Sequence, residues 1–163
     1  MLKQLPIIQQ DELLSSVIYR YARRMHIKDD KVLLEHLFKN NKIVPSSLFQ
    51  GHIAQLLEVS GGYLNISAIE LAENHTLLPL FKPFIPESRY KKLLNDLVNS
   101  NKSAFSFRSG FNASVVQYPK LYKVCYQCFH DQKNTSGYVF AHRLFQSPGV
   151  EICPMHERFL YKT

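Results

Sequence analysis

The chain has 163 residues, 45% of them hydrophobic and 20% charged, the composition of an ordinary globular domain or of a domain with a small metal-bound appendage. The N-terminus lacks the long apolar stretch of a signal peptide, and the most apolar segment, 77–86, contains three prolines, so we expect a cytoplasmic protein without a membrane partner. The net charge of +7 favours an acidic partner, most simply nucleic acid.

The first hundred residues are expected to form a helical domain. Apolar residues recur there at steps of three and four, and turn residues separate the periodic segments. Asp11 is the candidate N-cap of the first helix, and Asp29 or Asp30 is that of the second. The expected helices cover residues 11–25, 30–39, 46–60, 66–73 and 87–98.

The third and fourth expected helices flank a short turn at 61–64. Such a pair is typical of a helix-turn-helix, which places its second helix in the major groove of DNA. Helical hairpins of this size are more often packing units, so both interpretations stay open.

Three arginines lie towards the end of the first expected helix: Arg20, Arg23 and Arg24. Cations at this end complement the helix dipole, which is the simplest interpretation of them. Contact with phosphate is the alternative.

Prolines interrupt residues 74–86 and forbid a continuous helix there. Each proline also favours extended geometry in the residue before it, so we expect this segment to run extended across the helical layer. His75 at its start is a candidate for a capping or hydrogen-bonded structural role, with a functional role as the alternative.

A polar linker at 100–103 is the expected boundary between the helical domain, 1–100, and a basic unit, 101–163. All three cysteines of the chain lie in this unit, as Cys125-x-x-Cys128 followed by Cys153-x-x-His156. Each two-residue spacing points both ligands of a turn at one ion, and three thiolates with one imidazole are a typical set for tetrahedral zinc. We therefore predict one structural Zn²⁺ bound by these four residues.

Other interpretations of the cysteines are weaker. A disulfide framework needs an even cysteine count, and a thioredoxin-like pair needs a βαβ pattern that the sequence lacks. Plain buried cysteines would not explain the matched spacing. His130 or His142 could replace His156 as the fourth ligand, although neither completes a two-residue gap.

No recognisable catalytic motif is present in the sequence. Four protein ligands leave no open position on a zinc ion, and the residue at the second histidine position of a His-Glu-x-x-His motif is Leu160. The sequence also lacks a phosphate-binding glycine loop. We therefore expect a mainly α protein, with a helical domain and a small zinc-finger-like α+β unit, that is not an enzyme.

The positive charge is concentrated in the expected zinc unit. Residues 101–163 contain eight lysines and arginines against three acidic residues. Cations interleaved with aromatic residues suit phosphate contact with stacking, although the aromatics could instead form a core around the zinc. The candidate nucleic-acid or partner-binding residues are Lys102, Arg108, Lys120, Lys123 and Arg143.

Several of these motifs together resemble the TniQ/TnsD family of transposon target-selection proteins. The similarity includes residues 11–16, the run from His75 to Phe84, the segment 146–150 and the two metal half-sites. In that family the His-Thr-Leu-x-Pro stretch and the Pro-Gly-Val before the second half-site are hallmark sequences. The chain departs from the family at Phe145 and Ser147 and in having no tryptophan.

The resemblance implies a non-catalytic selector in a Tn7-like transposition system. Such a protein recognises target DNA, or an RNA-guided complex bound to the target, and recruits a TnsC-like AAA+ ATPase that brings the transposase. The resemblance also implies a bacterial protein that lies with the nucleoid when bound to DNA. A zinc-containing DNA-binding regulator without a transposon partner is the alternative. Many family members are longer, so we expect either a short member or an N-terminal fragment.

Overall fold

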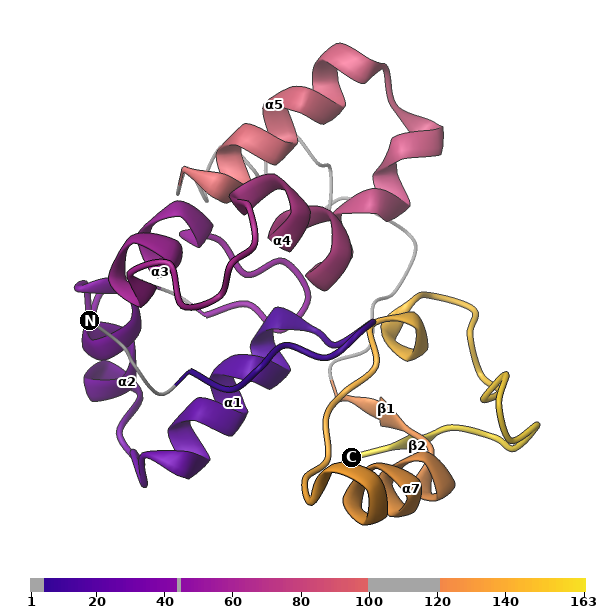
Figure 1. Ribbon diagram of the computed structural model, residues 1–163. Coiled ribbons are helices and arrows are strands. Elements are labelled where there is room, and N and C mark those ends of the chain that lie inside the picture. The colour runs from indigo at the N-terminus through magenta and orange to yellow at the C-terminus, as the bar shows by residue number, and fades with distance from the viewer. Residues whose placement is uncertain (1–4, 44, 100–120) are drawn as a thin grey trace.

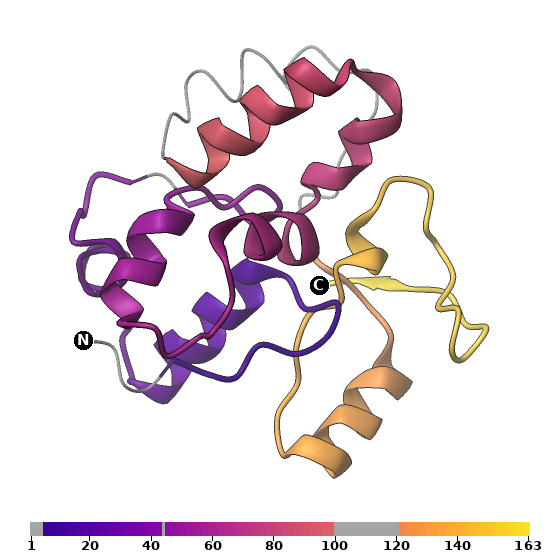
Figure 2. The same ribbon diagram turned by 45° about the horizontal axis from the view of Figure 1, so that its top comes forward.

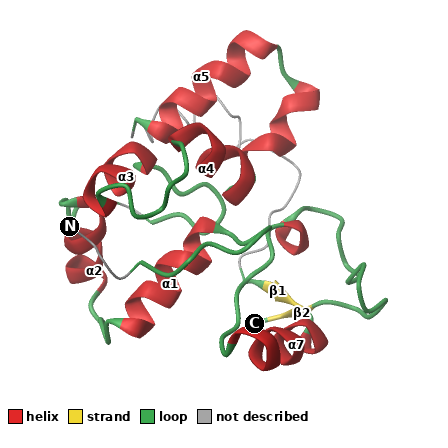
Figure 3. Ribbon diagram, in the orientation of Figure 1, coloured by secondary structure: helices red, strands yellow, loops and turns green. Residues whose placement is uncertain are grey.

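A computed structural model describes residues 5–43, 45–99 and 121–163. The N-terminal part is helical, and the C-terminal part combines helices with a two-stranded sheet (Figures 1 and 3), which confirms the predicted fold class. The helices of the N-terminal part are α1 (Leu14–Arg24), α2 (Asp30–Phe38), α3 (Ile53–Ser60), α4 (Ala68–His75), the 3-10 helix η1 (Leu78–Phe84) and α5 (Glu87–Val98). The C-terminal part contains β1 (Lys123–Val124), α7 (Tyr126–Ser136), the 3-10 helix η3 (Leu144–Gln146) and β2 (Tyr161–Lys162). The expected boundary at 100–103 lies outside the described residues.

One apolar core fills the N-terminal part. Helix α4 packs against both α3 and α5 in this layer (Figure 2). The buried side chains of the core come from α1 to α5 and include Leu14, Phe38, Ile53, Leu71 and Leu93. A second, much smaller cluster in the C-terminal part consists of the three cysteines, Phe145 and Leu160. The C-terminal part therefore has little apolar core of its own.

Local sequence signals define several helix ends. Asp29 is the N-cap of α2, as predicted, and its carboxylate accepts hydrogen bonds from two backbone amides of the first turn. Ser67 and Glu70 form a reciprocal capping box at the start of α4. Gly61 ends α3 with a φ of +60°, a conformation that glycine adopts without strain.

Two expected helix starts are wrong. Asp11 does not cap α1, because Leu13 is the N-cap and the side chain of Asp11 is engaged elsewhere. The third helix begins at Ile53 rather than at residue 46. The residues before it form a turn, in which the side chain of Gln50 accepts a hydrogen bond from the amide of Ser46.

The proline-rich segment is also different from its prediction, because residues 78–84 form a 3-10 helix rather than an extended strand. The hydroxyl of Thr76 accepts a hydrogen bond from the amide of Leu78 at 3.1 Å and starts this helix. Pro79 lies in the first turn, where a backbone amide has no intrahelical partner to lose. The short i to i+3 pattern therefore accommodates the prolines.

The expected helix pair is present as α3 and α4, which pack against each other across the turn between them. Their charge is unsuited to phosphate, because the sequence from 43 to 81 contains three glutamates and neither lysine nor arginine. We therefore interpret α3 and α4 as a packing unit of the core.

Among the helices that the structure describes, none combines the length and the apolar character that a membrane crossing requires.

The two parts of the chain are joined by a seam, which we define as residues 11–13 and 141–143. In two hydrogen bonds, of 3.0 and 2.7 Å, a backbone amide of one segment donates to a carbonyl of the other. Glu12 and His142 form an antiparallel bridge at the centre of this pairing. The seam therefore joins the helical part to the C-terminal part by backbone hydrogen bonds of the kind that pair antiparallel strands.

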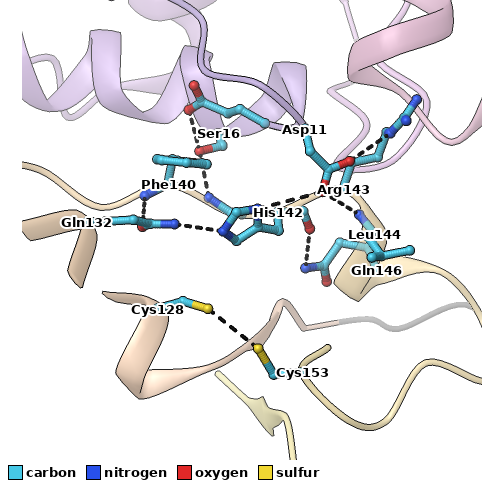
Figure 4. Close-up of polar contacts among 12 residues, drawn as sticks. Asp11, Ser16, Cys128, Gln132, Phe140, His142, Arg143, Leu144, Gln146 and Cys153 are labelled. Carbon is cyan, nitrogen blue, oxygen red and sulfur yellow. Dashed lines mark hydrogen bonds and ion pairs between the residues drawn. The ribbon is translucent and has the colours of Figure 1, made fainter. Parts of the chain in front are cut away.

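Side chains reinforce the seam around Asp11 (Figure 4). The guanidinium of Arg143 lies 3.2 Å from the Asp11 carboxylate and also donates a hydrogen bond to the carbonyl of Glu73 at 2.5 Å. Burial raises the pKa of Asp11, but the hydrogen bonds from His142 and the Leu144 amide and the charge of Arg143 outweigh it. The pKa of Asp11 is therefore held below its ordinary value.

A buried polar group lies directly behind the seam. The carboxylate of Glu12 is fully buried and pairs with the guanidinium of Arg20, and the hydroxyl of Ser16 donates a further hydrogen bond to it at 2.8 Å. The Nδ1–H of His75, at the end of α4, donates to the Glu12 carbonyl at 2.7 Å. His75 therefore has a structural role, and it ties α4 to the seam.

The burial of His75 predicts that the stability of the fold depends on pH. Burial lowers the pKa of His75 below its ordinary value of 6.5, the Glu12 carbonyl opposes this, and the charge of Arg143 lowers the pKa further. The unfolded chain therefore binds more protons than the folded one just below pH 6.5, so stability falls as the pH drops through that window.

We expect the His75→Asn variant, whose side-chain amide nitrogen takes the place of Nδ1 and can donate the same hydrogen bond, to lose less stability than the unchanged chain between about pH 7 and about pH 5. Urea unfolding at constant ionic strength measures this difference. Groups outside the surroundings of His75 contribute equally to both chains, so their effect cancels in the comparison. A difference between the two chains that does not change with pH would contradict the prediction.

Candidate metal centre

The structure brings the four predicted zinc ligands together. Cys125 follows β1 and precedes α7, and Cys128 lies in the first turn of α7. Cys153 and His156 lie on one turn of the segment that leads to β2. The four ligand atoms all lie within 4.8 Å of one another, and the three cysteine side chains are buried. These residues form a cluster that can hold a metal ion.

The separations of the ligand atoms fit a tetrahedral ion. The sulfur of Cys128 lies 3.6 Å from that of Cys153, and the Nδ1 of His156 lies 3.3 to 3.6 Å from the three sulfurs. Zinc bonds of about 2.3 Å to sulfur and about 2.05 Å to nitrogen give tetrahedral edges of about 3.8 and about 3.6 Å. The donor set and its spacing are therefore compatible with zinc binding.

The protonation of the thiols depends on the backbone of α7. Burial raises the pKa of the Cys125 thiol, but hydrogen bonds from the Cys128 amide, the Cys153 thiol and the Gln127 amide outweigh it and lower the pKa. Burial and the neighbouring sulfurs raise the pKa of the Cys128 thiol. Three thiolates so close together require a cation between them, which is the charge that a divalent metal supplies.

Asp131 on α7 supports the imidazole ligand from outside the cluster. The Nε2 of His156 lies 3.0 Å from a carboxylate oxygen of Asp131, and the side-chain amide of Gln127 donates to the other oxygen at 3.1 Å. A carboxylate on the far nitrogen fixes the ring with Nδ1 towards the sulfurs. The sequence analysis missed Asp131, whose signal is its place one helical turn after Cys128.

The second half-site is held by backbone hydrogen bonds in a tight hairpin. The Cys153 amide donates to the Arg158 carbonyl, and the Glu157 amide donates to the Cys153 carbonyl, each at 2.8 Å. Ile152 and Phe159 form an antiparallel bridge at the base of the turn. The turn therefore presents Cys153 and His156 on the same side.

Gln146 connects β1 to the seam. Its fully buried side-chain amide accepts a hydrogen bond from the Lys123 amide and donates to the carbonyls of Lys123 and His142. The arrangement satisfies the buried backbone of β1 on its open edge. Gln146 thus links the strand that leads to the metal ligands with the seam.

The predicted binding cations lie in different places. Lys123 is buried, and its ammonium donates to the carbonyls of Ser147 and Val150, so it faces the interior of the C-terminal part. Arg143 is half-buried in the seam. The remaining three lie outside the described residues: Lys102, Arg108 and Lys120.

The two alternative histidines are not members of the cluster among the residues that the structure describes. His130 is exposed on α7, and His142 lies in the seam, where the side-chain amide of Gln132 donates to its Nε2 at 2.9 Å.

The structure thus combines a helical part, a strand-like seam and a small unit with a Cys3His cluster. The chain belongs to the TniQ family, whose model matches residues 5–160. Its sequence is 28% identical over 165 residues to the transposon Tn7 transposition protein TnsD of Escherichia coli. That match covers 98% of this chain and 32% of TnsD, so the chain spans about a third of the length of this curated relative. The predicted resemblance to the TniQ/TnsD family is confirmed.

The contact between His156 and Asp131 predicts an effect on metal affinity. We expect the Asp131→Asn variant to bind zinc about 10- to 100-fold more weakly, because the ring loses its charged partner. Competition with a chromophoric chelator measures the affinity. The Glu157→Gln variant, which removes an exposed acidic charge next to His156 in the sequence, is the control. Equal affinities for all three proteins would show that Asp131 does not support the ligand.

Proposed function

We propose that this chain is a non-catalytic target-selection module of a Tn7-like transposition system. It binds target DNA, or an RNA-guided complex bound to the target, and recruits a TnsC-like AAA+ ATPase that regulates the transposase. The observation that carries this proposal is the match of the TniQ family to almost the whole chain, together with the similarity to a Tn7 transposition protein.

One Zn²⁺ bound by Cys125, Cys128, Cys153 and His156 has a structural role in this proposal. Four protein ligands complete a tetrahedron and leave no position for a reacting water. In the described residues of the C-terminal part, the buried apolar cluster is small and consists of Phe145, Leu160 and the three cysteines, so metal binding would supply stability that this core does not. Structural zinc sites contribute about 10–16 kcal/mol of apparent binding free energy, which is enough to order a unit of this size.

Contact with DNA in this proposal relies on the predicted cations of the basic unit other than Lys123 and Arg143. Lys102, Arg108 and Lys120 are the predicted residues that remain, because Lys123 is buried and Arg143 holds the seam. Exposed cations that neutralise phosphates make binding weaken as salt rises. Duplex binding by this chain should therefore show that dependence.

The recruitment of an ATPase is tested by co-purification. We expect the full chain to retain a TnsC-like AAA+ regulator from the same transposon and not an unrelated AAA+ ATPase, with duplex binding that weakens about tenfold or more between about 50 and 200 mM salt. Retention of neither ATPase, with duplex binding intact, would favour a zinc-containing DNA-binding regulator instead. Loss of both activities would reject the proposal.

The structural role of zinc is tested by removal of one ligand. We expect the Cys153→Ser variant to lose zinc and to lose amide protection in α7 and in residues 141–160, while α2 to α5 keep theirs. The control is Met155→Ser, which changes an exposed side chain between the same two ligands. Hydrogen exchange and metal analysis make the measurement. Unchanged protection in α7 without bound zinc would contradict the structural role.

A further inference from the structure

A groove of about 700 Å³ lies between the two parts of the chain, on the side of α1 away from the core. Tyr19, Arg23 and Arg24 on the exposed side of α1 form one wall, and residues where α7 ends, among them Lys133 and Val139, form the other. The chain that leaves α7 runs towards α1 in both ribbon views (Figures 1 and 2). We call this the α1–α7 groove. It exists only when the two parts are docked through the seam.

Every charged residue that lines the α1–α7 groove in the described structure is a cation. Arg20 forms its floor, where the buried Glu12 balances the charge and the guanidinium lies 4.5 Å from the centre of the Tyr138 ring. Arg23 and Lys133 are exposed, and neither forms an ion pair with a described residue. The charge of Arg20 at the floor of the groove is therefore balanced by Glu12, whereas Arg23 and Lys133 make the rim positively charged.

Apolar side chains lie beside these cations. Ile7 is 71% exposed and Tyr19 is 61% exposed, and Val139 on the opposite wall is also exposed. Large apolar side chains gathered in one concave site mark a surface that another molecule covers. A suitable ligand carries negative charges for the rim and apolar groups for the walls.

We propose that the α1–α7 groove binds a short acidic peptide segment of a partner protein, one that alternates carboxylates with apolar side chains. Carboxylates of such a segment would meet Arg23 and Lys133, and its apolar side chains would cover Ile7 and Val139. This proposal stands apart from the proposed function, because it concerns the chemistry of one groove and its test uses a peptide alone.

Nucleic acid fits the same groove less well. A volume of about 700 Å³ holds a short extended segment and not a duplex. A single strand gains its affinity from bases stacked on open aromatic faces. Arg20 covers one face of the Tyr138 ring, which leaves the exposed rings of Tyr19 and Tyr63 for such stacking. The aliphatic side chains of Ile7 and Val139 cannot form hydrogen bonds or ion pairs with sugar and phosphate. They can pack against apolar side chains of a peptide.

The test is fluorescence anisotropy with three labelled probes and the full chain. The first probe is a ten-residue peptide that alternates Asp or Glu with Leu or Phe. The second is the same peptide with Asn and Gln in place of the acids, and the third is a ten-nucleotide oligothymidylate. We expect the acidic peptide to bind about tenfold or more tightly than either of the others at the same salt.

A pair of double charge reversals locates the binding. We expect Arg23→Glu with Lys133→Glu to weaken the acidic peptide about tenfold or more. The matched control, Lys42→Glu with Lys92→Glu, changes the net charge equally at exposed positions that do not line the groove, and it should change the affinity less than about twofold. Circular dichroism and zinc content confirm that both variants are folded.

Three results would overturn the proposal. The acidic and amide peptides could bind equally, or both double variants could weaken the peptide to the same extent, which would indicate attraction by net charge alone. The oligothymidylate could bind more tightly and be lost in the Arg23 and Lys133 double variant, which would assign the groove to single-stranded nucleic acid.

Discussion

The backbone pairing between residues 11–13 and 141–143 is the contact on which the rest of the structure depends. It joins two parts whose apolar cores differ greatly in size. The core of the helical part is large, and that of the C-terminal unit is small among the described residues. Asp11 adopts a φ of +56°, which an aspartate tolerates better than most residues, and its carboxylate meets Arg143 across the pairing. The C-terminal unit is therefore ordered from two sides, by the seam and by its own metal ligands.

Most residues that carry the family resemblance serve this arrangement rather than contact a ligand. His75 and Thr76 of the His-Thr-Leu-x-Pro stretch fix the end of α4 and the start of η1, next to the Glu12 backbone. The backbone carbonyl of Val150, in the Pro-Gly-Val before the second half-site, accepts a hydrogen bond from the Lys123 ammonium. Gln146 closes the open edge of β1. These residues of the family motifs thus hold the helical part and the unit with the Cys3His cluster together.

The same arrangement explains where binding surfaces can form. The helix pair α3 and α4 is acidic and committed to the core, and Lys123 is used inside the C-terminal unit. The arginines at the end of α1, together with Lys133, remain on the surface at the junction of the two parts. A surface of this kind changes whenever the docking of the two parts changes, so binding there is coupled to the order of the metal unit.

The sequence by itself determined the helical class, the caps at Asp29 and Gly61 and the four residues that form one Cys3His cluster. These features follow from local periodicity and from the spacing of ligands within a turn, which depend on near neighbours in the chain. Only the tertiary structure decided that Asp11 pairs across the seam instead of capping a helix and that Lys123 is buried. The partners of both side chains lie far away in the sequence, and a charged residue has the same local signal in either environment.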